Sequence, residues 1–137
     1  MTAPMGIAMV QCKDTIIASE ICEEMFVPRN PHLEFCLAGA EIISNASGSH
    51  HQLRKLNTRL NLIQNCSMRN NCVYMYNNLK GCDGTRLYFD GSSMITMNGL
   101  IYTQAPQFSI DDVDVEVATL DLDQVRAARL ANHSRVS

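Results

Sequence analysis

The first third of the chain contains an apolar strand that runs directly into an acidic turn. Thr15–Ser19 consists of β-branched and small residues without a breaker, which predicts a strand of the core. The turn Glu20–Pro28 follows at once and places Cys22 at the end of a rigid strand, where a fold can expose a nucleophile. Because free cysteines are among the most buried residues, a packing role for Cys22 stays open at this point.

Strands and helices alternate along the rest of the chain. Apolar runs bounded by turn residues predict strands over residues 6–11, 41–44, 72–76, 86–89, 94–97 and 100–103, and helical spacing predicts helices over 32–40, 51–66 and 121–129. The longest helix carries an apolar stripe of Leu53, Leu56, Leu60 and Ile63, with Arg59 among the polar residues on its other sides. The sequence therefore predicts an α/β fold.

Three shorter patterns predict local structure. Lys13-Asp14 joins the first two strands and predicts a hairpin. Asn45–Ser49 predicts a small polar loop of the kind that binds ligands at the strand ends of α/β sheets. Apolar and acidic residues alternate over Val113–Val117, which predicts a strand with one solvated face.

The composition is that of one small globular domain. The 137 residues are 46% hydrophobic and 18% charged, and we expect a single domain over residues 1–131 followed by a loose tail over 132–137. A net charge of -3 gives no basic surface for nucleic acid or for an anionic membrane, and no apolar run is long enough for a transmembrane helix. The start of the chain lacks the pattern of a secretory signal.

The six cysteines do not point to disulfides or to a metal. They show no C-x-x-C spacing, and together with the histidines they form no recognisable zinc pattern. We therefore expect reduced thiols, no metal site and a cytoplasmic location.

Several long strings carry a specific resemblance to one protein family. They are the turn Glu20–Pro28, the pair Pro31-His32, the runs Ala38–His51 and Leu53–Lys55, and the segments Lys80–Gly84, Arg86–Gly91 and Gln107–Val113. These strings resemble the glutaminase domain of eukaryotic-type glutamine-dependent NAD synthetases, a branch of the nitrilase superfamily. The resemblance implies a nitrilase-type four-layer α-β-β-α sandwich, of which this chain would be the second half.

The resemblance also implies amide hydrolysis by a Cys-Glu-Lys triad. Cys22 matches the nucleophile, which would form a glutamyl thioester with glutamine and release ammonia. In the family, the general-base Glu and the Lys that stabilises the oxyanion precede the nucleophile on segments that this sequence does not contain. Lys13 and Glu20 match neither motif, and we interpret both as structural or solvated charges.

Four further residues match or adjoin substrate-binding positions of the family. By the resemblance, Ser49 and Lys55 would hold the head group of glutamine through a hydroxyl hydrogen bond and an ammonium–carboxylate pair. Arg54 is the alternative partner of the carboxylate, although without the resemblance the pattern favours an exposed helix face for both basic residues. Glu23 could receive the α-ammonium group or act as a structural acid.

The resemblance implies several components beyond this chain. The parent enzyme would pass ammonia to a synthetase domain that uses ATP and magnesium to amidate nicotinate adenine dinucleotide, whereas this chain itself would bind no cofactor. We expect glutamine, the N-terminal half of the domain and further copies in a homo-oligomeric parent enzyme as partners. Two alternatives stay open: a truncated, non-catalytic homologue that binds the full enzyme, and a different nitrilase-type amidase.

Overall fold

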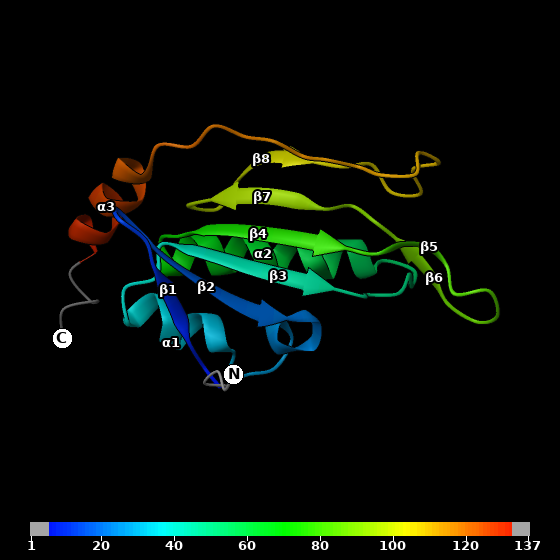
Figure 1. Cartoon of the computed structure of the whole chain (residues 1–137), viewed down its shortest axis with the longest axis horizontal. Coiled ribbons are helices and arrows are strands. Elements are labelled where there is room, and N and C mark those ends of the chain that lie inside the picture. The colour runs from blue at the N-terminus through cyan, green and yellow to red at the C-terminus, as the bar shows by residue number, and fades with distance from the viewer. Residues whose placement is uncertain (1–5, 133–137) are drawn as a thin grey trace, which may run out of the picture.

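The computed structural model describes residues 6–132, which form a six-stranded sheet, three α-helices and a separate hairpin (Figure 1). The strands of the sheet lie in the order β1-β2-β3-β4-β7-β8. Their bounds are β1 (Met9–Gln11), β2 (Ile16–Ile21), β3 (Ile42–Ser47), β4 (Val73–Asn78), β7 (Met94–Met97) and β8 (Leu100–Gln104). The hairpin consists of β5 (Lys80–Cys82) and β6 (Tyr88–Asp90).

The centre of the sheet is parallel. β2 pairs with β3 and β3 with β4 in parallel, whereas β1, β7 and β8 are antiparallel to their neighbours. Parallel neighbours need crossover connections, which α1 (Pro31–Leu37) and α2 (Lys55–Asn70) provide. Since both crossovers step across the sheet in the same direction, right-handed connections place both helices on one face, as Figure 1 shows. The carboxyl ends of β2, β3 and β4 therefore meet at one edge.

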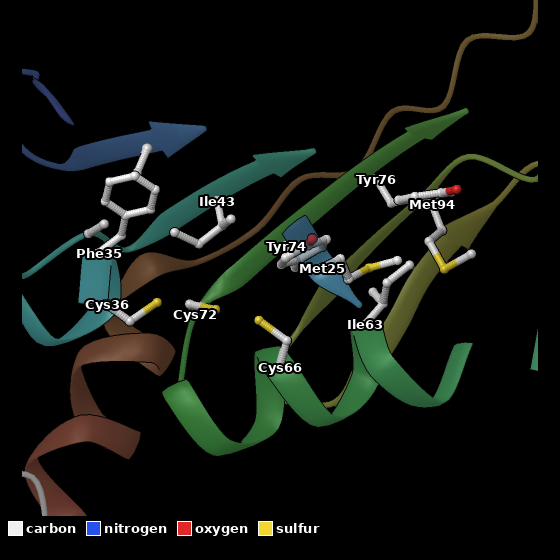
Figure 2. Packing of buried hydrophobic residues seen from close by; sticks show 12 residues of the cluster. Met25, Phe35, Cys36, Ile43, Ile63, Cys66, Cys72, Tyr74, Tyr76 and Met94 are labelled. Carbon is white, nitrogen blue, oxygen red and sulfur yellow. The ribbon is translucent and has the colours of Figure 1, made fainter. Parts of the chain in front are cut away.

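The main core lies between the sheet and these two helices. Its buried side chains are Ala18, Met25, Phe35, Cys36, Ala40, Ile43, Ile63, Cys66, Cys72, Tyr74, Tyr76 and Met94. Figure 2 shows Cys36, Cys72 and Cys66 next to one another in this core. The contact with Cys72 and burial raise the pKa of Cys36, so this thiol stays protonated and unreactive.

The opposite face of the sheet is covered at one end only. There α3 (Leu122–Ala131) packs Val125 against Val73 and Met97. The rest of this face contains a hollow lined by Ser44, Ala46, Met75, Asn77 and Ile95, beside residues 114–116. The described residues thus supply one sheet with one layer of crossover helices.

The structure confirms the α/β class and most of the predicted elements. β7 has the predicted bounds, and the predicted hairpin forms with Val10 opposite Ile17. The Asp121 side chain begins α3 by accepting a hydrogen bond from the backbone N–H of Asp123. Residues 133–137 of the predicted tail lie outside the described residues.

Helix α2 begins later than the sequence predicts. Its first residue is Lys55 rather than His51, because Arg54 has a positive φ of 66° and cannot belong to a right-handed helix. Leu53 therefore lies before the helix and is 90% exposed, so it does not contribute to the predicted apolar stripe.

The same helix also ends later and buries a different face. It continues past the predicted end at Cys66, since the Asn70 side chain donates to the Cys66 carbonyl and Asn71 in the left-handed conformation ends the helix. Its buried residues are Arg59, Ile63, Cys66, Ser67 and Asn70. The prediction that Arg59 lies on a polar side is therefore wrong.

Strand β3 extends further than the sequence predicts. Asn45–Ser47, predicted as a loop, continue the strand because they pair in register with Tyr76–Asn78 of β4. The polar loop therefore starts at Gly48, and Asn45 is a buried strand residue.

The predicted strand over Val113–Val117 is wrong. This segment has no regular secondary structure, and its acidic residues are less exposed than its valines. Asp114 lies 3.0 Å from Nζ of Lys80, and Glu116 accepts a hydrogen bond from Oγ1 of Thr103. The valines are 73–81% exposed, so the two faces are the reverse of the predicted ones.

Candidate active site

Cys22 lies where β2 ends and the short 3-10 helix η1 (Cys22–Met25) begins. Its φ of 44° is in the left-handed region, which costs a non-glycine residue about 1–3 kcal/mol. The backbone N–H of Cys22 donates to Oδ1 of Asn45 on the adjacent strand β3, at 3.0 Å, and the cysteine is half-buried. Cys22 thus occupies a strained turn at the end of a core strand, where the sequence predicts it.

A buried polar cluster surrounds Glu20, two residues before Cys22. Its carboxylate accepts hydrogen bonds from Tyr74 Oη and from the backbone N–H of His32 (3.1 Å), and His32 Nδ1 lies 2.9 and 3.0 Å from its two oxygens. Burial raises the pKa of Glu20, but the hydrogen bonds from His32 and Tyr74 outweigh this effect and hold the pKa below its usual value. Glu20 is therefore a fully bonded, ionised structural group.

The two acidic residues after Cys22 have different surroundings. Glu24 Oε2 accepts a hydrogen bond from the backbone N–H of Ile21 at 2.6 Å and closes the first turn of η1. Glu23 is exposed, and its carboxylate makes no hydrogen bond or ion pair with the described residues. Its charge is therefore accessible next to Cys22, the predicted nucleophile.

Ser49 lies just after β3, and its backbone is held by Asn78 at the end of β4. Asn78 Oδ1 accepts the Ser49 N–H at 2.8 Å, and Asn78 Nδ2 donates to the Ser49 carbonyl at 3.1 Å. Ser49 is 4% exposed, yet its hydroxyl has no hydrogen-bond partner among the described residues. A buried polar group without a partner is unfavourable, so this hydroxyl is suited to binding a polar ligand atom.

An ion pair between Arg59 and Asp90 lies behind the Ser49 loop. Arg59 Nη2 donates to Asp90 Oδ2, which also accepts from Gln107 Nε2 at 2.6 Å, and Asn78 Nδ2 lies 3.5 Å from Asp90 Oδ1. Burial raises the pKa of Asp90, but the bonds from Arg59 and Gln107 hold it below its usual value. This ion pair supports the residue that holds Ser49.

Arg54 and Lys55 lie at the start of α2 and share a shallow hollow with the nucleophile turn. The hollow is lined by Phe26, Gln52, Leu53, Arg54, Lys55 and Thr58. Phe26 is the residue that ends η1, four positions after Cys22. The fold therefore brings both predicted basic residues to the turn that carries the predicted nucleophile.

The predicted site residues share the edge at which the parallel strands end. Cys22 follows β2, Ser49 follows β3, and Asn78 is the last residue of β4. In open α/β sheets this edge is the usual place for a ligand. A thiol, a buried hydroxyl and nearby cations at one edge can bind a small polar substrate and attack it.

Four supporting residues were missed from the sequence: Asn45, Asn78, Arg59 and Asp90. Arg59 carried a signal, because it lies three residues after Leu56 and four before Ile63 and so falls on an apolar helix face. Asn45, Asn78 and Asp90 carried none, since their partners are 12 to 31 residues away in the chain.

The part of the chain that the structure describes contains no group of His, Cys, Asp or Glu that could hold a metal ion. Within the same residues, no helix is both long and apolar enough to cross a membrane.

Comparison with protein families identifies the kind of domain to which this site belongs. The sequence model described as carbon-nitrogen hydrolase matches residues 2–130. The chain belongs to the carbon-nitrogen hydrolase family. This membership confirms the family resemblance of the strings around Cys22 and Ser49.

Among full-length relatives, this carbon-nitrogen hydrolase chain is similar to glutamine-dependent NAD(+) synthetases. It is 54% identical over 134 residues to the enzyme from Macaca fascicularis and 53% identical over 132 residues to that from Saccharomyces cerevisiae. The alignments cover 98% and 96% of this chain but 19% and 18% of the relatives. The chain therefore spans about a fifth of their length.

Solved structures confirm the nitrilase-type fold. A CN-hydrolase superfamily protein from Xanthomonas campestris matches 98% of this chain with a TM-score of 0.76 at 15% identity, and the match covers 51% of that protein. A glutamine-dependent NAD(+) synthetase from Cytophaga hutchinsonii matches 80% of the chain with a TM-score of 0.68 at 29% identity, over 17% of its own length. The carbon-nitrogen hydrolase chain thus corresponds to about half of the Xanthomonas campestris protein.

Proposed function

We propose that this chain is the nucleophile-bearing part of a glutamine amidohydrolase domain that supplies ammonia for NAD synthesis. The Cys22 thiolate attacks the side-chain amide carbon of glutamine, the C–N bond breaks, and the amide nitrogen takes up a proton and leaves as ammonia. Water then hydrolyses the glutamyl thioester to glutamate and regenerates the thiol. The observation that carries this proposal is that the strained Cys22 turn and the buried, unpartnered hydroxyl of Ser49 lie at the same edge of the sheet.

The substrate head group binds on the side of Ser49 and Lys55. The Ser49 hydroxyl hydrogen-bonds the amino-acid group, and the Lys55 ammonium pairs with its carboxylate, with Arg54 as the alternative partner. The exposed carboxylate of Glu23 receives the α-ammonium. In this arrangement the side-chain amide is the end that faces Cys22.

The general base and the oxyanion lysine come from segments outside this chain. Glu20 is excluded because its carboxylate is already bonded to His32 and Tyr74. Lys13 is exposed in the hairpin before β2, and the six residues of β2 separate it from Cys22 by roughly 20 Å at about 3.3 Å per residue. We infer that the first half of the domain packs on the open sheet face and supplies both groups.

In the same proposal, the synthetase reaction and its cofactors belong to parts of the enzyme outside these 137 residues. ATP and magnesium act in a separate synthetase domain that amidates nicotinate adenine dinucleotide, in a homo-oligomeric cytoplasmic enzyme. The open sheet face also favours a second candidate function, in which the chain is a non-catalytic partner that docks on the full enzyme. A different nitrilase-type amidase is less favoured, because the relatives named above are glutamine-dependent synthetases.

Selective labelling of Cys22 tests the proposed function. The protein used is a chimera in which this chain replaces the matching segment of the full-length Saccharomyces cerevisiae enzyme; we refer to it as the chimera. A glutamine-like electrophile should modify Cys22 before Cys12 and Cys82, the other accessible thiols, and free glutamine should protect it. The Cys22→Ser chimera should lose labelling and glutaminase activity.

Labelling is read by peptide mass spectrometry and activity by ammonia release. Uniform labelling of all six cysteines, unaffected by glutamine, would rule out Cys22 as the nucleophile. Glutaminase activity that persists in the Cys22→Ser chimera would do the same.

A further inference from the structure

The side chain of Asn45 joins the nucleophile turn to the buried Glu20 cluster. Its Oδ1 accepts the backbone N–H of Cys22 at 3.0 Å and the hydroxyl of Ser47 at 2.7 Å. Its Nδ2 donates to Tyr74 Oη at 3.1 Å and to Glu20 Oε1 at 3.4 Å. Asn45 is 1% exposed, so these four groups account for the surroundings of its amide.

The cluster allows only one orientation of this amide. Tyr74 donates its own proton to Glu20, so both Tyr74 Oη and the Glu20 carboxylate present acceptors to Asn45. A flipped amide would point an oxygen at the carboxylate and an N–H₂ group at the Cys22 N–H. The amide oxygen is therefore fixed towards Cys22.

The hydrogen bond from the Cys22 N–H to Asn45 acts on a residue whose backbone is strained. The φ of Cys22 is 44°, a conformation that persists only where the surroundings enforce it. Asn45 is on β3, whose neighbours β2 and β4 hold it in parallel register, so the Asn45 oxygen has a rigid support. The same hydrogen bond engages the Cys22 N–H, so this donor already has a partner within the fold.

We propose that Asn45 is the positioning residue of the Cys22 nucleophile, with Glu20 and Tyr74 orienting its amide. The inference rests on the proposed glutaminase function. Asn45 does not touch the substrate; it holds the Cys22 backbone in the conformation that aims the thiol. Its loss should impair attack on the amide and leave binding of glutamine at Ser49 and Lys55 intact.

The test compares Asn45→Ala with Asn61→Ala in the chimera. Asn61 is exposed on α2 and provides the same change of side chain away from the site. Because a misplacement of about 1 Å can lower a rate about 10²-fold, Asn45→Ala should lower kcat for glutamine hydrolysis about 10²-fold with KM changed less than about threefold. Asn61→Ala should leave both constants unchanged.

Two reactivity measurements separate positioning from a general loss of structure. Labelling of Cys22 by the glutamine-like electrophile should slow about 10²-fold in Asn45→Ala, whereas alkylation by iodoacetamide, which needs no bound geometry, should change less than about threefold. Equal kcat in the two variants, or a rise in KM without loss of kcat, would overturn the proposal.

Two additions keep the test decisive. If Asn45→Ala does not fold, Asn45→Ser keeps a polar group in the cluster with a side chain too short to bridge Cys22 and Glu20, and unchanged kcat in that variant would refute the proposal. If the unsubstituted chimera does not hydrolyse glutamine, the proposed function fails by itself. Hydrogen exchange then still tests Asn45, because the Cys22 amide should exchange about tenfold faster in Asn45→Ala and unchanged exchange would refute its role.

Discussion

Two asparagines from neighbouring strands hold the two ends of the site. Asn45 contacts the backbone of Cys22, and Asn78 binds both the N–H and the carbonyl of Ser49. Asn78 also donates to the Gly91 carbonyl at 3.0 Å, which ties the Ser49 loop to the end of β6. These hydrogen bonds fix the Ser49 backbone, so the loop cannot rearrange to give the Ser49 hydroxyl a partner within the described residues.

Substitutions at the proposed substrate-binding residues should affect the binding of glutamine rather than the chemical step. In the chimera, Ser49→Ala and Lys55→Ala should each raise KM for glutamine about 10- to 100-fold, because a hydrogen bond to a charged group contributes about 1.5–3 kcal/mol and each 1.4 kcal/mol is about tenfold. Their kcat should change little, since both residues meet the unreactive end of the substrate. Steady-state ammonia release measures both constants.

Lys13→Ala is the matched control for Lys55→Ala, since Lys13 is exposed at the other end of β2. Ser49→Ala should also leave the melting temperature unchanged, because the hydroxyl that it removes makes no hydrogen bond with the described residues. A loss confined to kcat would place Ser49 or Lys55 at the reacting amide instead. A larger rise in KM for Arg54→Ala than for Lys55→Ala would make Arg54 the carboxylate partner.

Among the elements, the turn between β7 and β8 shows how tightly the sheet meets α2. Asn98 and Gly99 have φ values of 50° and 87°, the two positive values that a tight hairpin turn requires. The Gly99 N–H donates to Ser67 Oγ at 3.0 Å, and Gln64 Nε2 donates to the Gly99 carbonyl at 3.1 Å. A Cβ at position 99 would lie 2.9 Å from Cβ of Met68, so only glycine fits this approach.

Gly99→Ala should destabilise the fold more than Gly84→Ala. Both glycines have positive φ, which costs an alanine about 1–2 kcal/mol, but a Cβ at Gly84 meets no atom within 4 Å. The clash with Met68 should therefore add about 1–3 kcal/mol at position 99. Thermal unfolding of the two variants in the chimera measures the difference.

Met68→Ala in the Gly99→Ala background checks the cause of this difference. Removing the Met68 side chain beyond its Cβ relieves part of the clash, so the double substitution should cost less than the sum of the single ones. Equal destabilisation at positions 84 and 99 would show that only backbone strain matters at the turn.

At the scale of the whole molecule, the sheet face opposite α1 and α2 is the main surface that no helix layer of the described residues fully covers. The two crossover helices cover one face of the sheet, whereas the hollow between Ser44, Met75 and Ile95 lies on the other. The Xanthomonas campestris protein of the same fold is about twice as long as the matched chain. A second half of similar size would bury this face, as the proposed function requires.

A polypeptide of these 137 residues alone should show no measurable glutaminase activity. Without a general base no group takes up the proton of the Cys22 thiol, and without the oxyanion lysine the developing charge has no cationic partner; each such group is worth roughly 10² to 10⁴ in rate. We also expect the isolated chain to aggregate or to need a partner, because its sheet face is left open.

Ammonia release and sedimentation of the purified chain check this expectation, with the chimera as the active control. A cooperatively folded monomer that releases ammonia from glutamine would contradict it. Such a result would mean that Lys13, Glu20 or Glu23 provides the catalytic function here attributed to the other half.

The sequence alone was sufficient for the features that depend on local patterns. Runs of β-branched residues and helical spacing identified the α/β class, the strand that ends at Cys22 and the bounds of β7, because burial of one face imposes a period that neighbouring residues share. Positions of the family strings identified Cys22, Ser49, Arg54 and Lys55 as candidates. The fold and the family are confirmed, whereas the roles of these residues stay predictions.

Tertiary structure decided the features that depend on partners distant in the chain. Arg59 is buried because Asp90, 31 residues later, returns to pair with it, and Asn45 supports Cys22 across 23 residues of chain. The valines of Val113–Val117 face solvent because Lys80 and Thr103 bind the alternate acids. A periodic pattern indicates that a segment has two faces. Only the groups that pack against the segment determine which face is buried and which side chains support the site.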